Sequence, residues 1–222
     1  MLAEEYTNSA SVPSLSNQEG KTISYIYECL KNASIPFKKA SSQPNLVLPL
    51  NENKYTQIFV EQVEVFVKSH PNIGVKNQYS DTFFNTKGIP DFYFHKVEEG
   101  VHNLPLIVFE VKILTTSFPK EREKEYVIGA KGNGGIERFK SEKHGFGLSQ
   151  CGLVGFIVEE DSVYWLKAIN EWIETLATAQ NDWHKDEILN GLEKAPGFNW
   201  LQSIAHRKSN DLELHHIWIA IN

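Results

Sequence analysis

The spacing of apolar residues along this chain predicts both helices and strands. Residues 17–32 place apolar side chains three and four apart, which predicts a first helix. From Asn51, a favourable N-cap residue, the stretch 51–70 repeats this spacing and predicts a second helix. Three prolines between the helices predict a loop over 33–51, and the Ser- and Asn-rich residues 1–17 predict a frayed start.

Strand patterns follow the second helix. Apolar runs at 89–97 and 105–114, joined by the polar turn 98–103, predict a β-hairpin. The second run is apolar almost throughout, as is the stretch 148–160, so we expect both to be central strands covered on both faces. The charged, glycine-rich stretch 115–147 between them predicts a long loop, and long loops often carry function.

The last part of the chain predicts a helix over 161–180, capped by Asp161 or Ser162. This helix and the strand before it would form a strand-to-helix crossover. A polar helix over about 182–193, a Pro-Gly break and a last strand at 212–222 complete the expected elements.

The length and composition support one globular domain, and the predicted helices and strands place it in the α/β class. We expect the N-terminal helix and Pro-rich connection of 1–49 to pack on a core formed by 50–222. The net charge of -6 counts against a protein that coats nucleic acid with its whole surface, but not against one with a local basic groove. No apolar run approaches the ~18 residues of a membrane span, and the N-terminus lacks a signal-type run, so we expect a cytoplasmic protein without membrane contact. Cys29 and Cys151 are expected to be reduced core residues.

The predicted hairpin contains three charged residues, Asp91, Glu110 and Lys112. Side chains alternate faces along a strand, so Glu110 and Lys112 point the same way, and pairing across the turn brings Asp91 opposite Glu110. Two facing carboxylates repel unless they share a proton or a divalent cation. Oxygen ligands favour Mg²⁺, with Mn²⁺ as a substitute, and a lysine beside the ion can assist the attack of water on phosphorus. The alternative is a structural ion pair on a solvated sheet face.

A further carboxylate lies on the second helix. The helical period puts Glu52 near the centre of the apolar face, with Glu61 on the opposite side and Glu64 on the flank. A carboxylate on an inward face needs a partner, so Glu52 is a candidate third metal ligand and Glu64 an auxiliary one. Because Glu52 lies in the first turn of the helix, it could instead simply interact favourably with the helix dipole.

The sequence Ile89-Pro90-Asp91, followed by Glu110-Val111-Lys112 on the next apolar strand, resembles the signature of the PD-(D/E)xK nuclease superfamily. The resemblance covers residues 50–180. It implies a restriction-endonuclease-like fold, a central mixed β-sheet flanked by helices in the order helix, strand, strand, strand, helix, strand. In this assignment the strand within 148–160 is the third strand and 161–180 is the crossover helix.

The resemblance also implies a chemistry. Asp91 and Glu110 would bind Mg²⁺, Lys112 would be the catalytic lysine, and a glutamate of the preceding helix would join the site. The expected activity is that of a metal-dependent endonuclease that hydrolyses phosphodiester bonds, of DNA in preference to RNA, in a restriction or anti-phage defence context. The alternative is a nucleic-acid-binding or assembly subunit of a larger defence complex, with a protein partner or a second copy and little activity alone.

Residues around the Gly-rich segment 132–135 offer a nucleic-acid contact. Backbone amides of such a turn can approach phosphates and nearby cations attract them, although a solvated loop is the plainer interpretation. The candidates are Lys131, Arg138, Lys140 and Lys143, with His144 beside them. Gln150 could contact the attacking water or a phosphate, or could simply be the polar end of a strand.

Overall fold

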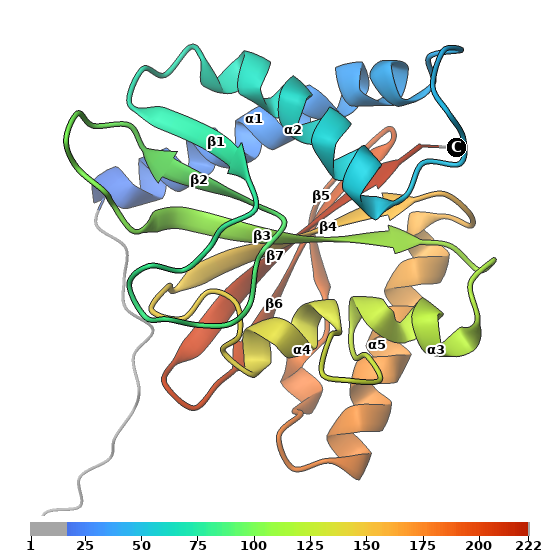
Figure 1. Cartoon of the computed structure of the whole chain (residues 1–222). Coiled ribbons are helices and arrows are strands. Elements are labelled where there is room, and N and C mark those ends of the chain that lie inside the picture. The colour runs from blue at the N-terminus through green and yellow to red at the C-terminus, as the bar shows by residue number, and fades with distance from the viewer. Residues whose placement is uncertain (1–16, 222) are drawn as a thin grey trace, which may run out of the picture.

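The computed structural model describes residues 17–221 and shows an α/β fold built on one mixed sheet of seven strands (Figure 1). The strands are β1 (Ile73–Asn77), β2 (Phe92–Lys96), β3 (Pro105–Leu114), β4 (Gln150–Ile157), β5 (Asn190–Ala195), β6 (Phe198–His206) and β7 (Asp211–Ala220). The helices are α1 (Asn17–Ser41), α2 (Glu52–Val67), α3 (Lys120–Glu123), α4 (Gly135–Lys140) and α5 (Ser162–Ala179), with 3₁₀ turns η1 (Lys124–Tyr126) and η2 (Lys185–Glu187).

The strand order across the sheet is β1-β2-β3-β4-β7-β6-β5. β3, β4 and β7 are parallel at the centre, and antiparallel pairs lie on both sides of them. Parallel neighbours need crossovers. The segment with α3, η1 and α4 connects β3 to β4, and α5 with the β5–β6 hairpin connects β4 to β7.

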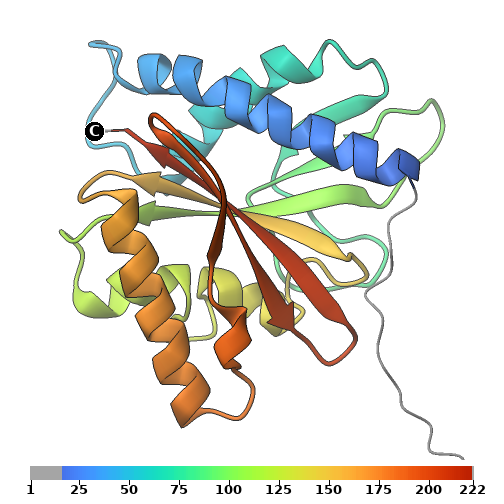
Figure 2. The same ribbon diagram turned by 180° about the vertical axis from the view of Figure 1, so that it is seen from behind.

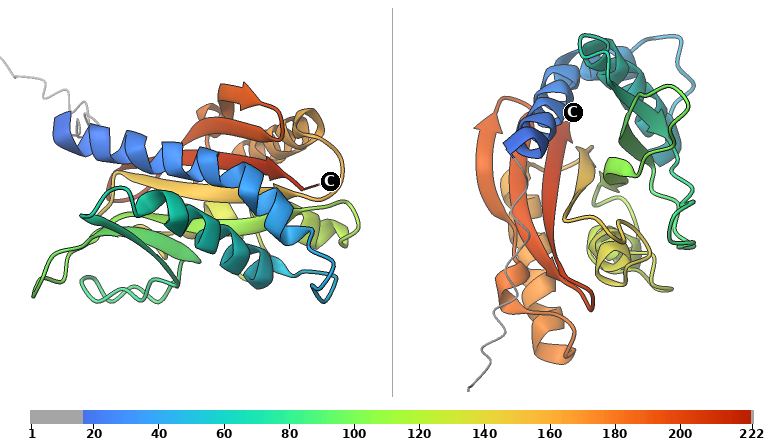
Figure 3. Two further views of the ribbon diagram at one scale, coloured as in Figure 1. Left: turned by 90° about the horizontal axis from the view of Figure 1, so that it is seen from above. Right: turned by 90° about the vertical axis from the view of Figure 1, so that its left-hand side faces the viewer.

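Helices cover both faces of the sheet. α1 and α2 lie side by side on one face, while α3, α4 and α5 lie on the other (Figures 1 and 2). The sheet between these two layers is clear in the side views of Figure 3. No helix within residues 17–221 combines the length and apolar character needed to cross a bilayer.

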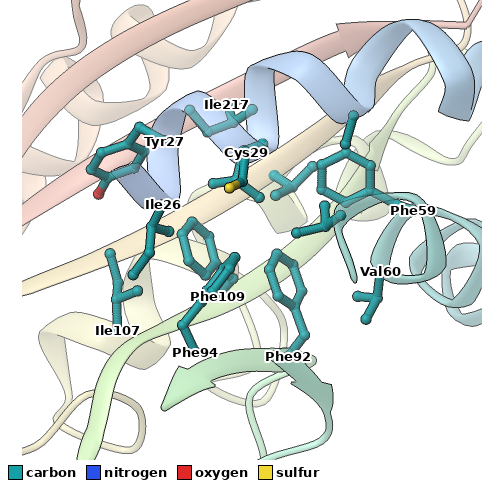
Figure 4. Packing of buried hydrophobic residues seen from close by; sticks show 14 of the residues in the cluster. Ile26, Tyr27, Cys29, Phe59, Val60, Phe92, Phe94, Ile107, Phe109 and Ile217 are labelled. Carbon is teal, nitrogen blue, oxygen red and sulfur yellow. The ribbon is translucent and has the colours of Figure 1, made fainter. Parts of the chain in front are cut away.

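Each face of the sheet has its own apolar core. Figure 4 shows the first, where aromatic side chains of the β2–β3 hairpin pack beneath α1 and α2. Phe92 and Phe109 stack across the hairpin with ring centroids 4.7 Å apart, and Phe59 of α2 meets Phe92 edge to face. The second core lies under α4 and α5 and includes the fully buried Trp165 and Trp218. Such double coverage explains the continuous apolar character of β3 and β4.

The main predicted elements are present. The hairpin forms, α2 begins after Asn51, whose side chain accepts from Lys54 N at 3.0 Å, and α5 is capped by Asp161. Cys29 and Cys151 are free thiols buried in the core, as expected. The expected frayed start lies largely outside the described residues.

Two predictions about the connections are wrong. α1 continues through Pro36 to Ser41, because Ala33 and Phe37 are fully buried against the sheet and this packing outweighs the lost backbone hydrogen bond. The stretch 115–147 contains short helices rather than a structureless loop. Ile136 and Phe139 of α4 are buried in the core, and their packing holds α4 on the sheet.

The C-terminal part also differs from the prediction. Instead of a helix over 182–193, the chain forms the short turn η2 and then the edge strand β5. Strand β6, which the sequence pattern did not identify, pairs with both β5 and β7. Gly191 and the turn at Pro196-Gly197 favour this hairpin over a helix.

Candidate functional site

The candidate site lies where strands β2 and β3 part. The regular pairing ends at Phe92 and Phe109, and just beyond it the Asp91 N–H donates to the Phe109 carbonyl at 2.9 Å. The Val111 N–H then donates to Asp91 Oδ2 at 2.7 Å instead of to a neighbouring strand. The carboxylate of Asp91 thus takes the place of a backbone partner along the free edge of β3, opposite Glu110.

Glu110 is the centre of this site and is fully buried. Its Oε1 accepts from Lys112 Nζ at 2.8 Å and from Arg138 Nη1, and its Oε2 lies 3.3 Å from His144 Nδ1. Burial acts to raise the pKa of Glu110, but the nearby His144 and the charges of Lys112 and Arg138 outweigh it and lower the pKa to about 2. Glu110 is therefore an ionised carboxylate inside the protein.

Lys112 joins two glutamates from different elements. Its Nζ donates to Glu110, to the Val111 carbonyl at 2.9 Å and to Glu52 Oε1 at 3.3 Å. Burial acts to lower the pKa of Lys112, but the surrounding carboxylates raise it overall. The stem of Lys112 passes beneath the first residue of α4, Gly135, where an added Cβ would lie 2.6 Å from a Leu153 methyl carbon. Glycine at this position therefore lets α4 pack closely on Leu153 and on the Tyr126 carbonyl.

Glu52 reaches the site from the first turn of α2, which lies over the C-terminal half of β3 (Figure 1). Burial raises its pKa, and Lys112 acts against that change. Glu64, the auxiliary candidate, lies away from the site and pairs with Lys68 at 3.6 Å. The helical period thus identified the glutamate that contacts the hairpin.

The negative charge of Asp91 is poorly compensated by its surroundings. Burial, and then the charge of Glu110, raise the pKa of Asp91 to about 7, against the lowering effect of Lys112. In addition, Glu110 Oε2 and His144 Nδ1 are buried without a hydrogen-bond partner that has acceptable geometry, although they lie 3.3 Å apart. A divalent cation would relieve the repulsion between the two acids and use the free oxygen.

The donor set therefore fits Mg²⁺ in its chemistry, since all three carboxylates offer hard oxygen ligands. The arrangement is not that of a closed metal site, however. Among residues 17–221 no three His, Cys, Asp or Glu side chains are grouped so that they could hold an ion. Lys112 and Arg138 instead occupy Glu110 Oε1.

A groove of about 660 Å³ adjoins the site. One wall is the loop 86–89, and the other is formed by the turn 131–133, by Arg138 and by residues 141–144. Arg138 and His144 line the groove and also contact Glu110, so these two side chains connect the groove to the central carboxylate. Its lining includes four cationic side chains and one acidic side chain, which are Lys87, Lys131, Arg138, Lys143 and Glu142. We call it the cationic groove.

Two predicted residues are directed elsewhere. Lys140 is on α4, but its side chain is only 6% exposed and forms an ion pair with the buried Glu187. Its Nζ also donates to the His206 carbonyl at 3.2 Å, so the structure does not group it with the groove cations. Gln150 belongs to the opposite face of the sheet from Glu110 and donates to Glu213 Oε2 at 3.3 Å, which leaves it no contact with the site.

The Gly-rich segment also has a different role from the expected one. Gly134 and Gly135 are buried, and a Cβ on Gly134 would lie 2.4 Å from the Ile128 Cα. These glycines let α4 pack against the preceding backbone, while Glu137 Oε2 accepts from the Gly129 and Gly134 N–H groups. Only Gly132 and Asn133 of this segment line the cationic groove.

Sequence reasoning placed His144 only among the loop residues. The structure buries it beside Glu110, with its ring edge to face with Phe139 at 5.6 Å. It packs on Gly88, where a Cβ would lie 2.2 Å from both His144 Cδ2 and the Lys143 carbonyl oxygen. No periodicity connects residues 88 and 144, so only the fold could reveal this contact.

Comparison of the chain with protein-family models, with curated proteins and with solved structures finds no match.

Proposed function

We propose that this protein is a Mg²⁺-dependent nuclease of the PD-(D/E)xK type, with a restriction-endonuclease-like fold, that hydrolyses phosphodiester bonds. The observation that carries the proposal is the convergence of Asp91, Glu110, Lys112 and Glu52. These residues come from β3, from the residue before β2 and from the first turn of α2. Lys112 Nζ donates to Glu110 and Glu52, and Asp91 accepts from the N–H of Val111, the residue between Glu110 and Lys112. We assign the helix, strand, strand, strand, helix, strand order to α2-β1-β2-β3-α4-β4. This differs from the assignment expected from the sequence, in which the strand within 148–160 was the third strand and 161–180 the crossover helix, because β1 precedes the hairpin and α4 forms between β3 and β4.

Each residue has a role in this proposal. Asp91 and Glu110 would hold the ion, with Glu52 as the third carboxylate. When bound, Mg²⁺ supplies Lewis-acid stabilisation of phosphate charge and lowers the pKa of a coordinated water. Lys112 Nζ is held among these carboxylates, where it can orient a water and stabilise the negative charge that develops on the phosphoryl oxygens.

The cationic groove supports a polyanionic substrate. Lys87 and Lys131 are exposed on its two walls, and Lys143 donates to the Gly132 carbonyl at 2.7 Å across the turn. Cations placed along a groove bind the phosphate backbone without reading the bases. Because the overall charge is -6, we place this attraction at a local site, the groove. DNA is the substrate that we propose.

The test is incubation of supercoiled plasmid DNA with the purified protein and Mg²⁺, beside Lys112→Met and Lys167→Met variants. Lys167 is an exposed lysine of α5, 77% exposed at its side chain, and serves as the matched control. We expect nicking by the wild type and by Lys167→Met, and loss of cleavage in Lys112→Met and in EDTA. Cleavage by Lys112→Met at the wild-type rate would reject the proposed site. A labelled RNA of the same sequence tests the choice of DNA.

A binding module is the second candidate, and one observation favours it. The Glu110 carboxylate is already neutralised by Lys112 and Arg138, as in a structural ion network. Such a subunit of a larger defence complex would bind DNA equally well with or without Mg²⁺ and would cut nothing. Electrophoretic mobility shifts in Mg²⁺ and in EDTA, read with the plasmid assay, separate the two functions.

A further inference from the structure

Arg138 has an unusual position for a groove cation. It projects from α4, its side chain is 29% exposed, and it lines the cationic groove, yet its guanidinium contacts the fully buried Glu110. It shares the Oε1 atom of Glu110 with Lys112. Two cationic groups thus meet at one oxygen of the central carboxylate.

The two cations differ in how firmly they are held. Lys112 is 9% exposed at its side chain and has three acceptors, which are Glu110, Glu52 and the Val111 carbonyl. Among residues 17–221, Glu110 is the single side-chain partner of the Arg138 guanidinium. Arg138 also borders the groove and has open space to move into. Of the two, Arg138 is the one that can leave.

We propose that Arg138 is a displaceable counter-ion, which neutralises Glu110 in the metal-free protein, leaves it when a divalent cation binds, and then binds a substrate phosphate in the cationic groove. This inference rests on the proposed function. A divalent cation on Glu110 would face a guanidinium at hydrogen-bond distance, and like charges so close in a buried site repel strongly. The planar guanidinium matches phosphate oxygens in the same way that it matches a carboxylate.

The proposal gives Arg138 a role in the metal-free protein, in which Arg138 and Lys112 both donate to Glu110 Oε1. It also links two events. Metal binding would free a phosphate-binding group, so metal and substrate would each strengthen the binding of the other, as linkage requires.

The test measures metal affinity and cleavage separately. Mn²⁺ is titrated calorimetrically into the wild type, Arg138→Gln and Arg122→Gln, without DNA. Arg122 of α3 is the matched control, since it lies over Phe118 and contacts Glu125, away from the site. Single-turnover cleavage of a DNA duplex is then measured at saturating Mn²⁺.

We expect Arg138→Gln to bind Mn²⁺ at least about tenfold more tightly, because the ion no longer competes with a charged hydrogen bond, and yet to cut about tenfold more slowly. Arg122→Gln should match the wild type in both measurements. A purely structural role would lower both quantities in Arg138→Gln. Thermal unfolding of each variant verifies the fold, and Arg138→Lys, which keeps the charge, should bind Mn²⁺ more weakly than Arg138→Gln does.

The outcomes separate this inference from the proposed function. Unchanged or weaker Mn²⁺ binding by Arg138→Gln, with a wild type that binds Mn²⁺ and cuts DNA, overturns the displacement of Arg138 and leaves the nuclease intact. Tighter binding with undiminished cleavage overturns the phosphate role of Arg138. A wild type that binds no Mn²⁺ and cuts nothing rejects both the inference and the function.

Discussion

The repulsion between Asp91 and Glu110 predicts that Asp91→Asn stabilises the metal-free protein at neutral and higher pH. Asparagine has the same shape, and its side-chain oxygen can still accept from the Val111 N–H, which now donates to Asp91 Oδ2 at 2.7 Å. What the substitution removes is the negative charge opposite Glu110. A residue retained for its chemistry at the cost of stability should behave in this way.

The magnitude follows from the pKa of Asp91. The folded protein keeps this proton up to about pH 7, whereas the reference pKa of the side chain is 3.8. Between these pH values the folded state binds more protons than the unfolded state, so the free energy of unfolding falls as the pH rises from about 4 to about 7. The window of about 3 pH units at 1.36 kcal/mol each gives an upper limit of about 4 kcal/mol, and the partial exposure of Asp91 reduces this to about 2 kcal/mol.

The assay is urea unfolding of wild type and Asp91→Asn in EDTA at pH 5 and pH 8, monitored by tryptophan fluorescence. We expect Asp91→Asn to be more stable than the wild type by about 2 kcal/mol at pH 8 and by only about a third of that at pH 5, where about one of the three pH units of the window has been crossed. Glu61→Gln, on the exposed side of α2, is the control for loss of one negative charge. If Asp91→Asn is less stable than the wild type at pH 8, Asp91 makes favourable charge contacts and our account of the site is wrong.

Three further variants test the packing and charge of the fold. Gly88→Ala should cost about 1–3 kcal/mol and slow cleavage, because its Cβ would collide with His144 and with backbone, and Gly191→Ala, with open space around it, should be tolerated in the same melts. Lys140→Met should destabilise by about 3 kcal/mol, since it leaves Glu187 buried and unpaired, with unchanged DNA affinity per folded molecule by fluorescence anisotropy. Burial lowers the pKa of His216 from 6.5 to about 3, so the unfolded state binds the extra proton below pH 6.5 and stability falls on acidification, by up to about 1.4 kcal/mol per pH unit. His216→Gln should lose that part of the slope in urea titrations from pH 7 to pH 4, and an unchanged slope would contradict the assignment.

The parts of the site that the sequence predicted share a physical cause. Glu110 and Lys112 are two apart on a strand, so they share a face whatever the rest of the fold does. Asp91 follows from the hairpin register, and Glu52 from the helical period after the Asn51 cap. Each of these relations is local or spans one turn.

The parts that could not be predicted depend on contacts between distant segments. Arg138 and His144 reach Glu110 only because the buried residues of α4 hold that helix on the sheet. The direction of Lys140 depends on Glu187, which is 47 positions away in the sequence. A charge run shows which residues are cationic, but not which of them a buried acid will pair with.

The same distinction holds for the fold. The central strands β3 and β4 were predicted from continuous apolar runs. The edge strand β5 is largely exposed and polar, so its pattern was mistaken for a helix. The predicted first helix ended at residue 32 because Pro36 indicated a loop, although burial of Phe37 keeps the helix intact to Ser41. Tertiary packing decided both cases against local propensity.

The most direct test of the central claim is a crystal structure of the protein with Mn²⁺, with the ion located by its anomalous scattering. We predict a peak between the carboxylates of Asp91 and Glu110, with Glu52 directed at it and Arg138 moved from Glu110 into the cationic groove. A well-ordered site at high Mn²⁺ concentration in which Arg138 still holds Glu110 and no peak lies between the two acids would contradict the account.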